Sequence, residues 1–261
     1  MTTRSPQRAD GWAAAVRQRL GLGRLLPLGG PGDGVWIAET AAASVLRGAA
    51  AVPGTVLGKL RIGSAAESAV DPAETGTSAV DRGARASAPA PASVSAAAPA
   101  PAPAPVSALP AGPLRIEAEF SAGADRPLPD AAAAVREALW AAADARLGLD
   151  IAEVDLRVTE LLDGDAPDQV TPAVPTVPVA TADGPAAVAA AGVPGVVSLT
   201  AVLGPAVRTA QDHVRIEVAT AADRRALDVA RSVRRAVAAA TEDRLPVTVL
   251  VTNVVEPGPG T

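Results

Sequence analysis

Apolar and polar residues alternate in two stretches of the chain, and the two stretches read almost alike. Residues 114–120 have the sequence LRIEAEF, and residues 214–220 have the sequence VRIEVAT. Apolar residues at every second position are typical of a strand that buries one face. A Pro-Gly pair followed by an apolar run precedes each stretch, at residues 53–54 and 194–195. The pattern therefore predicts two equivalent strands in two related parts of the chain.

A helical pattern follows each of these predicted strands. Apolar residues recur there every four positions, which places them on one helical face. The matching positions are Val135, Leu139 and Ala143 in the first part and Val229, Val233 and Val237 in the second. Another strand pattern closes each part, DLRVTEL from Asp155 and VLVTNV from Val249. We interpret the chain as an α+β protein in which one helix-strand-strand-helix-strand unit occurs twice in tandem.

The composition changes along the chain and divides it into segments. Residues 63–113 are rich in Ala, Pro and Ser and poor in bulky apolar residues, so they predict a disordered insertion inside the first unit. The expected segments are a basic N-terminal segment (1–34), a first unit (35–162), a linker (163–182), a second unit (183–255) and a tail (256–261). Because each unit is small, we expect the two to share an interface.

Periodicity and turn residues give the bounds of the expected elements. Those of the first unit are a helix at 35–52, strands at 56–62 and 114–120, a helix at 130–147 and a strand at 151–162. Those of the second unit are a helix at 183–191, strands at 196–203 and 212–219, a helix at 222–241 and a strand at 247–255. Asp130 and Asp183 are the expected N-caps of their helices, and Gly148 is expected to end the helix before it.

The N-terminal segment carries a short basic amphipathic pattern at residues 11–26. Six residues form its apolar stripe and its cationic face: Trp12, Val16 and Leu20, and Arg17, Arg19 and Arg24. Such a helix could lie on an anionic membrane surface, or it could dock its stripe on its own domain or on a partner. These six residues are therefore the candidate contacts with a membrane or a partner. The Gly-rich loop at 29–34 lacks the Lys-Ser/Thr ending of a phosphate-binding loop and is expected to be a linker.

Composition narrows the functional classes. The formal net charge of −5 argues against nucleic acid as the main partner. The absence of cysteine excludes disulfides, thiolate metal sites and thiol nucleophiles, and it fits a reducing compartment such as the cytoplasm. No secretory signal is visible. The uncharged run at residues 184–207 contains Pro and Gly that interrupt a helix, so we do not expect it to span a membrane.

The candidate catalytic residues are few. His213 is the single histidine, and its neighbour Asp212 is expected to point to the opposite face of a strand, so a simple dyad is not expected. The arginines of the last helix alternate with Asp228, which favours ordinary pairing along the helix. We therefore expect a protein that is not an enzyme and that has no cofactor, no metal site and no small-molecule substrate.

Paired carboxylates are a second candidate for acid–base chemistry. Glu117 and Glu119 share one face of their strand, and Glu217 takes the equivalent of the first of these positions in the second unit. Two carboxyl groups can divide the roles of acid and base only in a cleft that separates their pKa values. Since Ala219 stands at the position of the other partner in the second unit, we expect this face of both units to be solvated.

Four features mark these units, and their order and spacing recur. They are an opening VWIAE helix at residues 35–39, a Val-Pro-Gly junction at 52–54 and 193–195, an IEAEF-type strand before the helix AAAAVREALWAA, and the closing strands DLRVTEL and VLVTNV. Through these features the chain resembles the alkaline-shock/general-stress envelope protein family of Gram-positive bacteria, over 35–162 without the insertion and over 183–254. Members of that family usually carry one unit, so the tandem pair is a departure.

The resemblance implies a non-enzymatic cytoplasmic protein that self-associates, gathers beneath the membrane through a small membrane-anchor protein and supports the envelope stress response. The first hypothesis is therefore a self-associating scaffold near the cytoplasmic face of the membrane. The alternative is a cytoplasmic adaptor that binds a protein or a small ligand between its two units. The residues alone leave both hypotheses open.

Overall fold

The computed structural model describes residues 21–66, 104–105, 107–163, 177–241 and 245–256. Within these residues the chain has the α+β fold that the sequence predicts, with helix-strand-strand-helix-strand order in each unit. Most of the expected insertion, most of the expected linker and most of the tail lie outside the described residues. So do residues 11–20 of the expected N-terminal helix.

The first unit forms a three-stranded sheet. Its elements are β3 (Thr55–Ser64), β4 (Leu114–Gly123), α3 (Leu128–Ala142), a π-helical turn (Ala143–Leu147) and β5 (Ile151–Leu162). The sheet has the order β3-β4-β5, with β4 antiparallel to β3 and parallel to β5. A parallel pair requires a crossover, and α3 provides it. The stripe of α3 formed by Val135 and Leu139 is buried, as the four-residue spacing predicts.

The second unit repeats this arrangement. Its elements are β6 (Val179–Ala180), α4 (Pro185–Ala191), β7 (Val196–Thr200), β8 (Val207–Thr209), β9 (Val214–Ala221), α5 (Ala226–Ala240) and β10 (Val247–Val255). β9 is antiparallel to β7 and parallel to β10, as β4 is to β3 and β5. The short strand β8 also pairs with β9. The two similar strand patterns thus occupy the same central position in their sheets.

The start of the first unit belongs to the sheet of the second. β1 (Leu25–Pro27) pairs with β2 (Val35–Ala38), and β2 runs parallel to β10, which gives a sheet of order β1-β2-β10-β9-β7-β6 with β8 beside β9. The prediction of a helix from residue 35 is therefore wrong for four residues, and α2 begins later, at Glu39–Ala49. All four side chains of β2 are buried, and Val, Trp and Ile favour strands, so pairing with β10 prevails over the helical pattern. The expected N-terminal helix likewise does not reach residue 26, because β1 includes Leu25 and Leu26.

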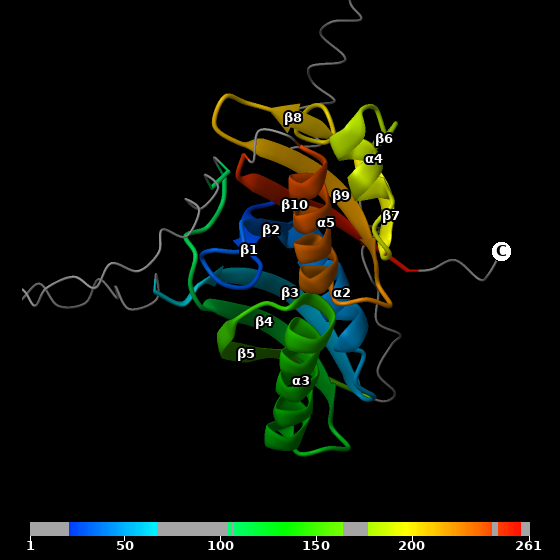
Figure 1. Cartoon of the computed structure of the whole chain (residues 1–261). Coiled ribbons are helices and arrows are strands. Elements are labelled where there is room, and N and C mark those ends of the chain that lie inside the picture. The colour runs from blue at the N-terminus through cyan, green and yellow to red at the C-terminus, as the bar shows by residue number, and fades with distance from the viewer. Residues whose placement is uncertain (1–20, 67–103, 106, 164–176, 242–244, 257–261) are drawn as a thin grey trace, which may run out of the picture.

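The two sheets are joined by one continuous hydrophobic core. In Figure 1, α5 lies over the larger sheet, α3 lies against the smaller sheet, and α2 lies between them. α2 contacts β10 of the second unit as well as β3 and α3 of the first. The two units are therefore packed together and are not joined only through their linker.

Several element ends differ from the expected ones. α3 begins at Leu128 and α4 at Pro185, and neither has a side-chain cap, so Asp130 and Asp183 are not the N-caps. A proline in the first turn of each helix supplies the fixed φ that starts it. Gly148 follows the π-helical turn with φ +85°, which confirms the expected stop. β7 ends at Thr200, because the chain then turns across β9.

Candidate binding cleft between the two units

A cleft of about 940 Å³ lies where residues 22–25 meet both units. The first unit contributes Glu39 of α2 and Arg61 of β3, and the second contributes Arg208 of β8 and Arg215 of β9. Residues 22–25 together with Ala104, Pro105 and Ser107 complete its wall. We call this site the arginine cleft, because its charged lining residues are four arginines (Arg24, Arg61, Arg208 and Arg215) and one glutamate. With His213 neutral the lining has a net formal charge of +3, opposite in sign to the whole chain.

Arg24 is fixed at the cleft by the first turn of α2. Its Nη2 donates to the carbonyl of Ile62 at 2.6 Å, and its Nε lies 3.5 Å from Oε2 of Glu39. Glu39 also accepts hydrogen bonds from the backbone N–H groups of Arg24 (3.2 Å) and Ile62 (3.3 Å). The carboxylate at the N-terminus of α2 therefore joins Arg24 to β3 and sets the direction of the Arg24 side chain.

Arg215 forms an ion pair with the buried Glu217. The Glu217 side chain is fully buried, and its Oε1 lies 3.0 Å from Nη2 of Arg215. Its Oε2 accepts from the backbone N–H groups of Val202 (2.8 Å) and Leu203 (3.0 Å). The expectation that Glu217 lies on a solvated face is therefore wrong, because the loop after β7 folds over it and supplies hydrogen-bond donors.

Two buried polar atoms of lining residues have no hydrogen-bond partner among the described residues. They are Nε of Arg215 and Oγ1 of Thr248. A buried donor without a partner costs roughly 1–3 kcal/mol, so each of these atoms favours the approach of an acceptor or a donor.

His213 also lines the cleft and is joined to its neighbour. Its Nδ1 lies 2.8 Å from Oδ1 of Asp212, and the hydrogen bond from His213 lowers the pKa of the Asp212 carboxyl. The expectation that these side chains cannot meet is wrong, because both residues precede the first residue of β9 and do not yet alternate between strand faces. With Nδ1 donating to the carboxylate, Nε2 is the ring nitrogen left for another partner.

Arg61 and Arg208 provide the unpaired charge of the site. Both side chains are exposed, and in the part of the chain that the structure describes neither forms an ion pair. The cleft therefore combines two arginines held in place by carboxylates with two arginines that are available to a ligand.

The carboxylate pair of the first unit, Glu117 and Glu119, lies elsewhere, on the outer face of the smaller sheet. Glu117, Glu153 and Asp155 are exposed on the outer face of the smaller sheet, where they surround the Arg115 guanidinium. Glu119 is half-buried on the same face. The solvated sheet face expected for the first unit is therefore confirmed. Among the described residues, no group of three or more His, Asp or Glu side chains is arranged to hold a metal ion.

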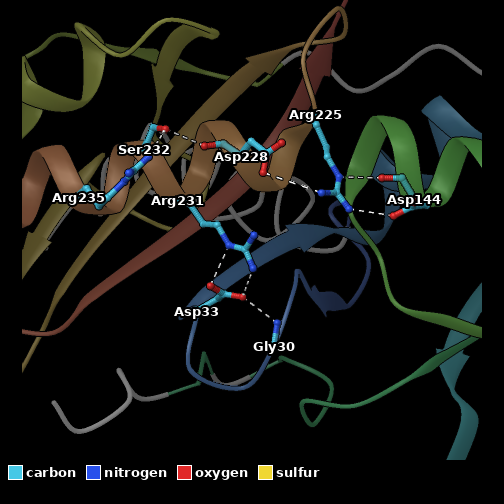
Figure 2. A network of polar contacts seen from close by, with 8 residues as sticks. All are labelled: Gly30, Asp33, Asp144, Arg225, Asp228, Arg231, Ser232 and Arg235. Carbon is cyan, nitrogen blue, oxygen red and sulfur yellow. Dashed lines mark hydrogen bonds and ion pairs between the residues drawn. The ribbon is translucent and has the colours of Figure 1, made fainter. Parts of the chain in front are cut away.

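Arg231 of α5, and Arg225 directly before α5, pair with residues of other elements. Arg231 binds Asp33 through two hydrogen bonds, Nε to Oδ1 at 2.9 Å and Nη2 to Oδ2 at 2.8 Å, as Figure 2 shows. Arg225 reaches Asp144 of the first unit at 2.9 Å. The expected pairing along the helix is thus wrong for Arg231. The Gly-rich loop at residues 29–34, which we expected to be a linker, instead forms hydrogen bonds with α5.

The six candidate contacts of the N-terminal segment have separate outcomes. Five of them lie outside the described residues: Trp12, Val16, Arg17, Arg19 and Leu20. The sixth, Arg24, lines the arginine cleft. No helix in the described ranges is long and apolar enough to cross a membrane.

Sequence patterns offered little sign of this cleft, because its charged residues are spread from position 24 to position 215 without a regular spacing. One signal was available for the buried Glu217. On β10, Thr248 lies opposite Arg215 and the apolar Leu250 lies opposite Glu217, and both are buried.

We compared the chain with models of known protein families, with curated proteins and with solved structures, and none of the three comparisons found a match.

Proposed function

We propose that this protein is a non-enzymatic adaptor that binds a ligand in the arginine cleft between its two units. The observation that supports this function is the cleft itself, whose volume of about 940 Å³ lies within the range of small-molecule sites. Arginine stays protonated at physiological pH, and Glu39 is held by Arg24, so these groups are suited to binding and not to proton transfer. This proposal replaces our expectation that no small molecule is bound.

Filling the cleft tests this function. Ala210 lines the cleft, and we expect the variant Ala210→Trp to exclude the ligand without removing a charged group. The matched control is Ala239→Trp, on an exposed position of α5. Mass spectrometry of small molecules released from the purified, denatured proteins should detect a compound in the wild type and in the control that is lost from Ala210→Trp. Identical compounds and amounts from all three proteins would rule out a ligand in the cleft.

A self-associating scaffold is the second candidate, and the free edge of β5 favours it. Among the described residues β5 pairs only with β4, and its twelve residues leave the other edge open. An open strand edge is a template for pairing with another chain. If two copies of β5 pair antiparallel around Leu156, each Asp155 lies opposite Arg157 of the other copy, which favours pairing. This assembly would provide the scaffold that the resemblance to envelope stress proteins implies, with a small membrane-anchor protein as a further partner.

Charge reversal tests the scaffold separately from the adaptor. Arg157→Asp should place like charges opposite each other and shift the protein toward monomer in analytical ultracentrifugation. The double variant Asp155→Arg with Arg157→Asp should restore the assembly, because the pairs are again complementary. A wild-type protein that is monomeric at high concentration would contradict the scaffold proposal.

A further inference from the structure

We infer that the ligand of the arginine cleft is an anionic amphiphile with a phosphate-type head group. This inference rests on the proposed adaptor function and adds the chemical class of the ligand. It follows from the charge of the cleft, from the two buried atoms without partners and from the apolar residues beside them.

The head group is assigned by the guanidinium groups. Arginine presents a planar fork of donors that matches the oxygens of a phosphate, and several arginines together can surround such a group. Arg61 and Arg208 approach the cleft from opposite units and have no carboxylate partner among the described residues. Because Arg24 and Arg215 are already fixed by Glu39 and Glu217, less side-chain freedom is lost when an anion binds between them.

Arg215 adds a donor that no other described residue uses. Its Nη2 contacts both Glu217 (3.0 Å) and the carbonyl of Leu203 (3.3 Å), whereas its Nε has no partner in the described part of the chain. Within the same ranges, Oγ1 of Thr248 on the neighbouring strand β10 is also without a partner. An oxygen-rich head group placed beside Arg215 could satisfy both atoms, which an uncharged apolar ligand could not do.

The apolar part of the ligand is assigned by the remaining wall. Leu22, Leu25, Pro105 and Leu203 line the same cleft as the arginines. A phosphate group has the size of only a few water molecules, each of which occupies about 30 Å³ in the liquid, so it would leave most of the 940 Å³ unfilled. Leu22 and Leu25 are already buried, whereas Pro105 and Leu203 are only half-buried. An attached hydrocarbon chain or ring would cover their remaining surface and contribute about 25 cal/mol for each Å² removed from water.

Binding of simple probes tests the inference. Isothermal titration calorimetry would compare dodecyl phosphate, inorganic phosphate and dodecyl maltoside, each alkyl compound below its micelle concentration. We expect dodecyl phosphate to bind at least tenfold more tightly than either of the others. The double variant Arg61→Gln with Arg208→Gln should weaken dodecyl phosphate binding at least tenfold. The control, Arg126→Gln with Arg235→Gln, removes two exposed arginines outside the cleft and should leave binding unchanged.

The outcomes separate the ligand class from the function. If dodecyl maltoside binds as tightly as dodecyl phosphate, and loses affinity only in Ala210→Trp, the anionic class is overturned while the adaptor function stands. If inorganic phosphate binds as tightly as dodecyl phosphate, the apolar part of the inference is overturned. If both arginine double variants weaken binding equally, the alkyl phosphate binds by general charge and the inference fails. If no probe binds and Ala210→Trp also leaves the co-purified compounds unchanged, the proposed function fails with it.

Discussion

Removing the ion pair between Asp33 and Arg231 should destabilise the fold more than removing an ordinary surface pair. The two residues are 198 positions apart, and they join the loop before β2 to α5 of the second unit. Both oxygens of Asp33 accept from Arg231, and Oδ2 also accepts from the backbone N–H of Gly30 at 2.8 Å. Two parallel charge-assisted hydrogen bonds fix the relative position of the loop and the helix.

The exposure of the two side chains sets the expected size of the effect. The Asp33 side chain is 21% exposed and the Arg231 side chain is 43% exposed. Exposed pairs contribute roughly 0–1 kcal/mol, whereas breaking a fully buried pair costs roughly 3–5 kcal/mol. Because solvent reaches Arg231, we expect a coupling energy toward the lower end, about 1–2 kcal/mol.

A double-mutant cycle measures this coupling. Asp33→Ala, Arg231→Met and the double variant would be unfolded with urea, and methionine keeps the apolar stem of the arginine. The control cycle uses Arg146 and Glu256, whose side chains are 38% and 76% exposed and lie 3.5 Å apart. We expect a coupling energy below about 0.5 kcal/mol for the control pair.

The same pair should give a defined pH dependence. The hydrogen bonds from Arg231 lower the pKa of Asp33 below its ordinary value, so folding favours the ionised carboxylate. A lowered folded pKa means that the stabilisation is complete above the unfolded value of about 3.9 and is lost as the pH falls through the folded value. The difference in stability between the wild type and Asp33→Ala should therefore be constant from about pH 5 to pH 8 and should shrink below about pH 4. A coupling energy no larger than that of the control pair, or one that does not decrease in acid, would refute this reasoning.

Two further substitutions test the buried carboxylate and a tight helix end. Glu217→Ala should lower the free energy of unfolding by roughly 2–4 kcal/mol, because it removes the carboxylate that accepts from Arg215 and from two backbone N–H groups. In the same urea titration, Glu117→Ala at the exposed counterpart should change the free energy of unfolding by no more than about 0.5 kcal/mol. Gly148→Ala should lower the free energy of unfolding by roughly 2–4 kcal/mol, because residue 148 has φ +85° and its new Cβ would lie 2.6 Å from Cβ of Leu227. Gly54→Ala, at φ +77° with no described atom within 4 Å of the new Cβ, should lower it by only about 1 kcal/mol. Equal losses for both members of either pair would contradict the structural explanation.

Local patterns were sufficient for most elements of the fold. The expected strand at residues 151–162 matches β5 at both ends, and the strand at 247–255 matches β10. In both cases a run of alternating or continuous apolar residues lies between Gly, Pro or Asp residues, which mark the ends of the strand. β2 was missed because its four residues precede a helical pattern without a break, and because its partner β10 lies about 200 positions away. A pairing at that distance has no signature in a local window.

The candidate site was harder to predict, because it depends on which face of each sheet is covered. The motif RIE is identical in β4 and β9, and its glutamate is exposed in the first unit (Glu117) and buried in the second (Glu217). Alternation specifies the face on which a side chain lies, but not what covers that face. The His213–Asp212 contact was missed for a related reason, since the expected strand began two residues before the observed one.

The difference between the two units explains why the arginine cleft lies against the sheet of the second unit and not against the outer sheet face of the first. In the first unit the outer sheet face carries Arg115 and Glu117 and remains open to solvent. In the second unit the corresponding side of β9 lies beneath the loop after β7. The arginine cleft brings residues 22–25 and the described residues at 104, 105 and 107 together with Arg215 and Thr248. Those two segments come from the first unit and from the chain before it. Two similar units in one chain can therefore form a site that neither would form alone, since the first unit contributes Arg61 to its lining and the second contributes Arg208.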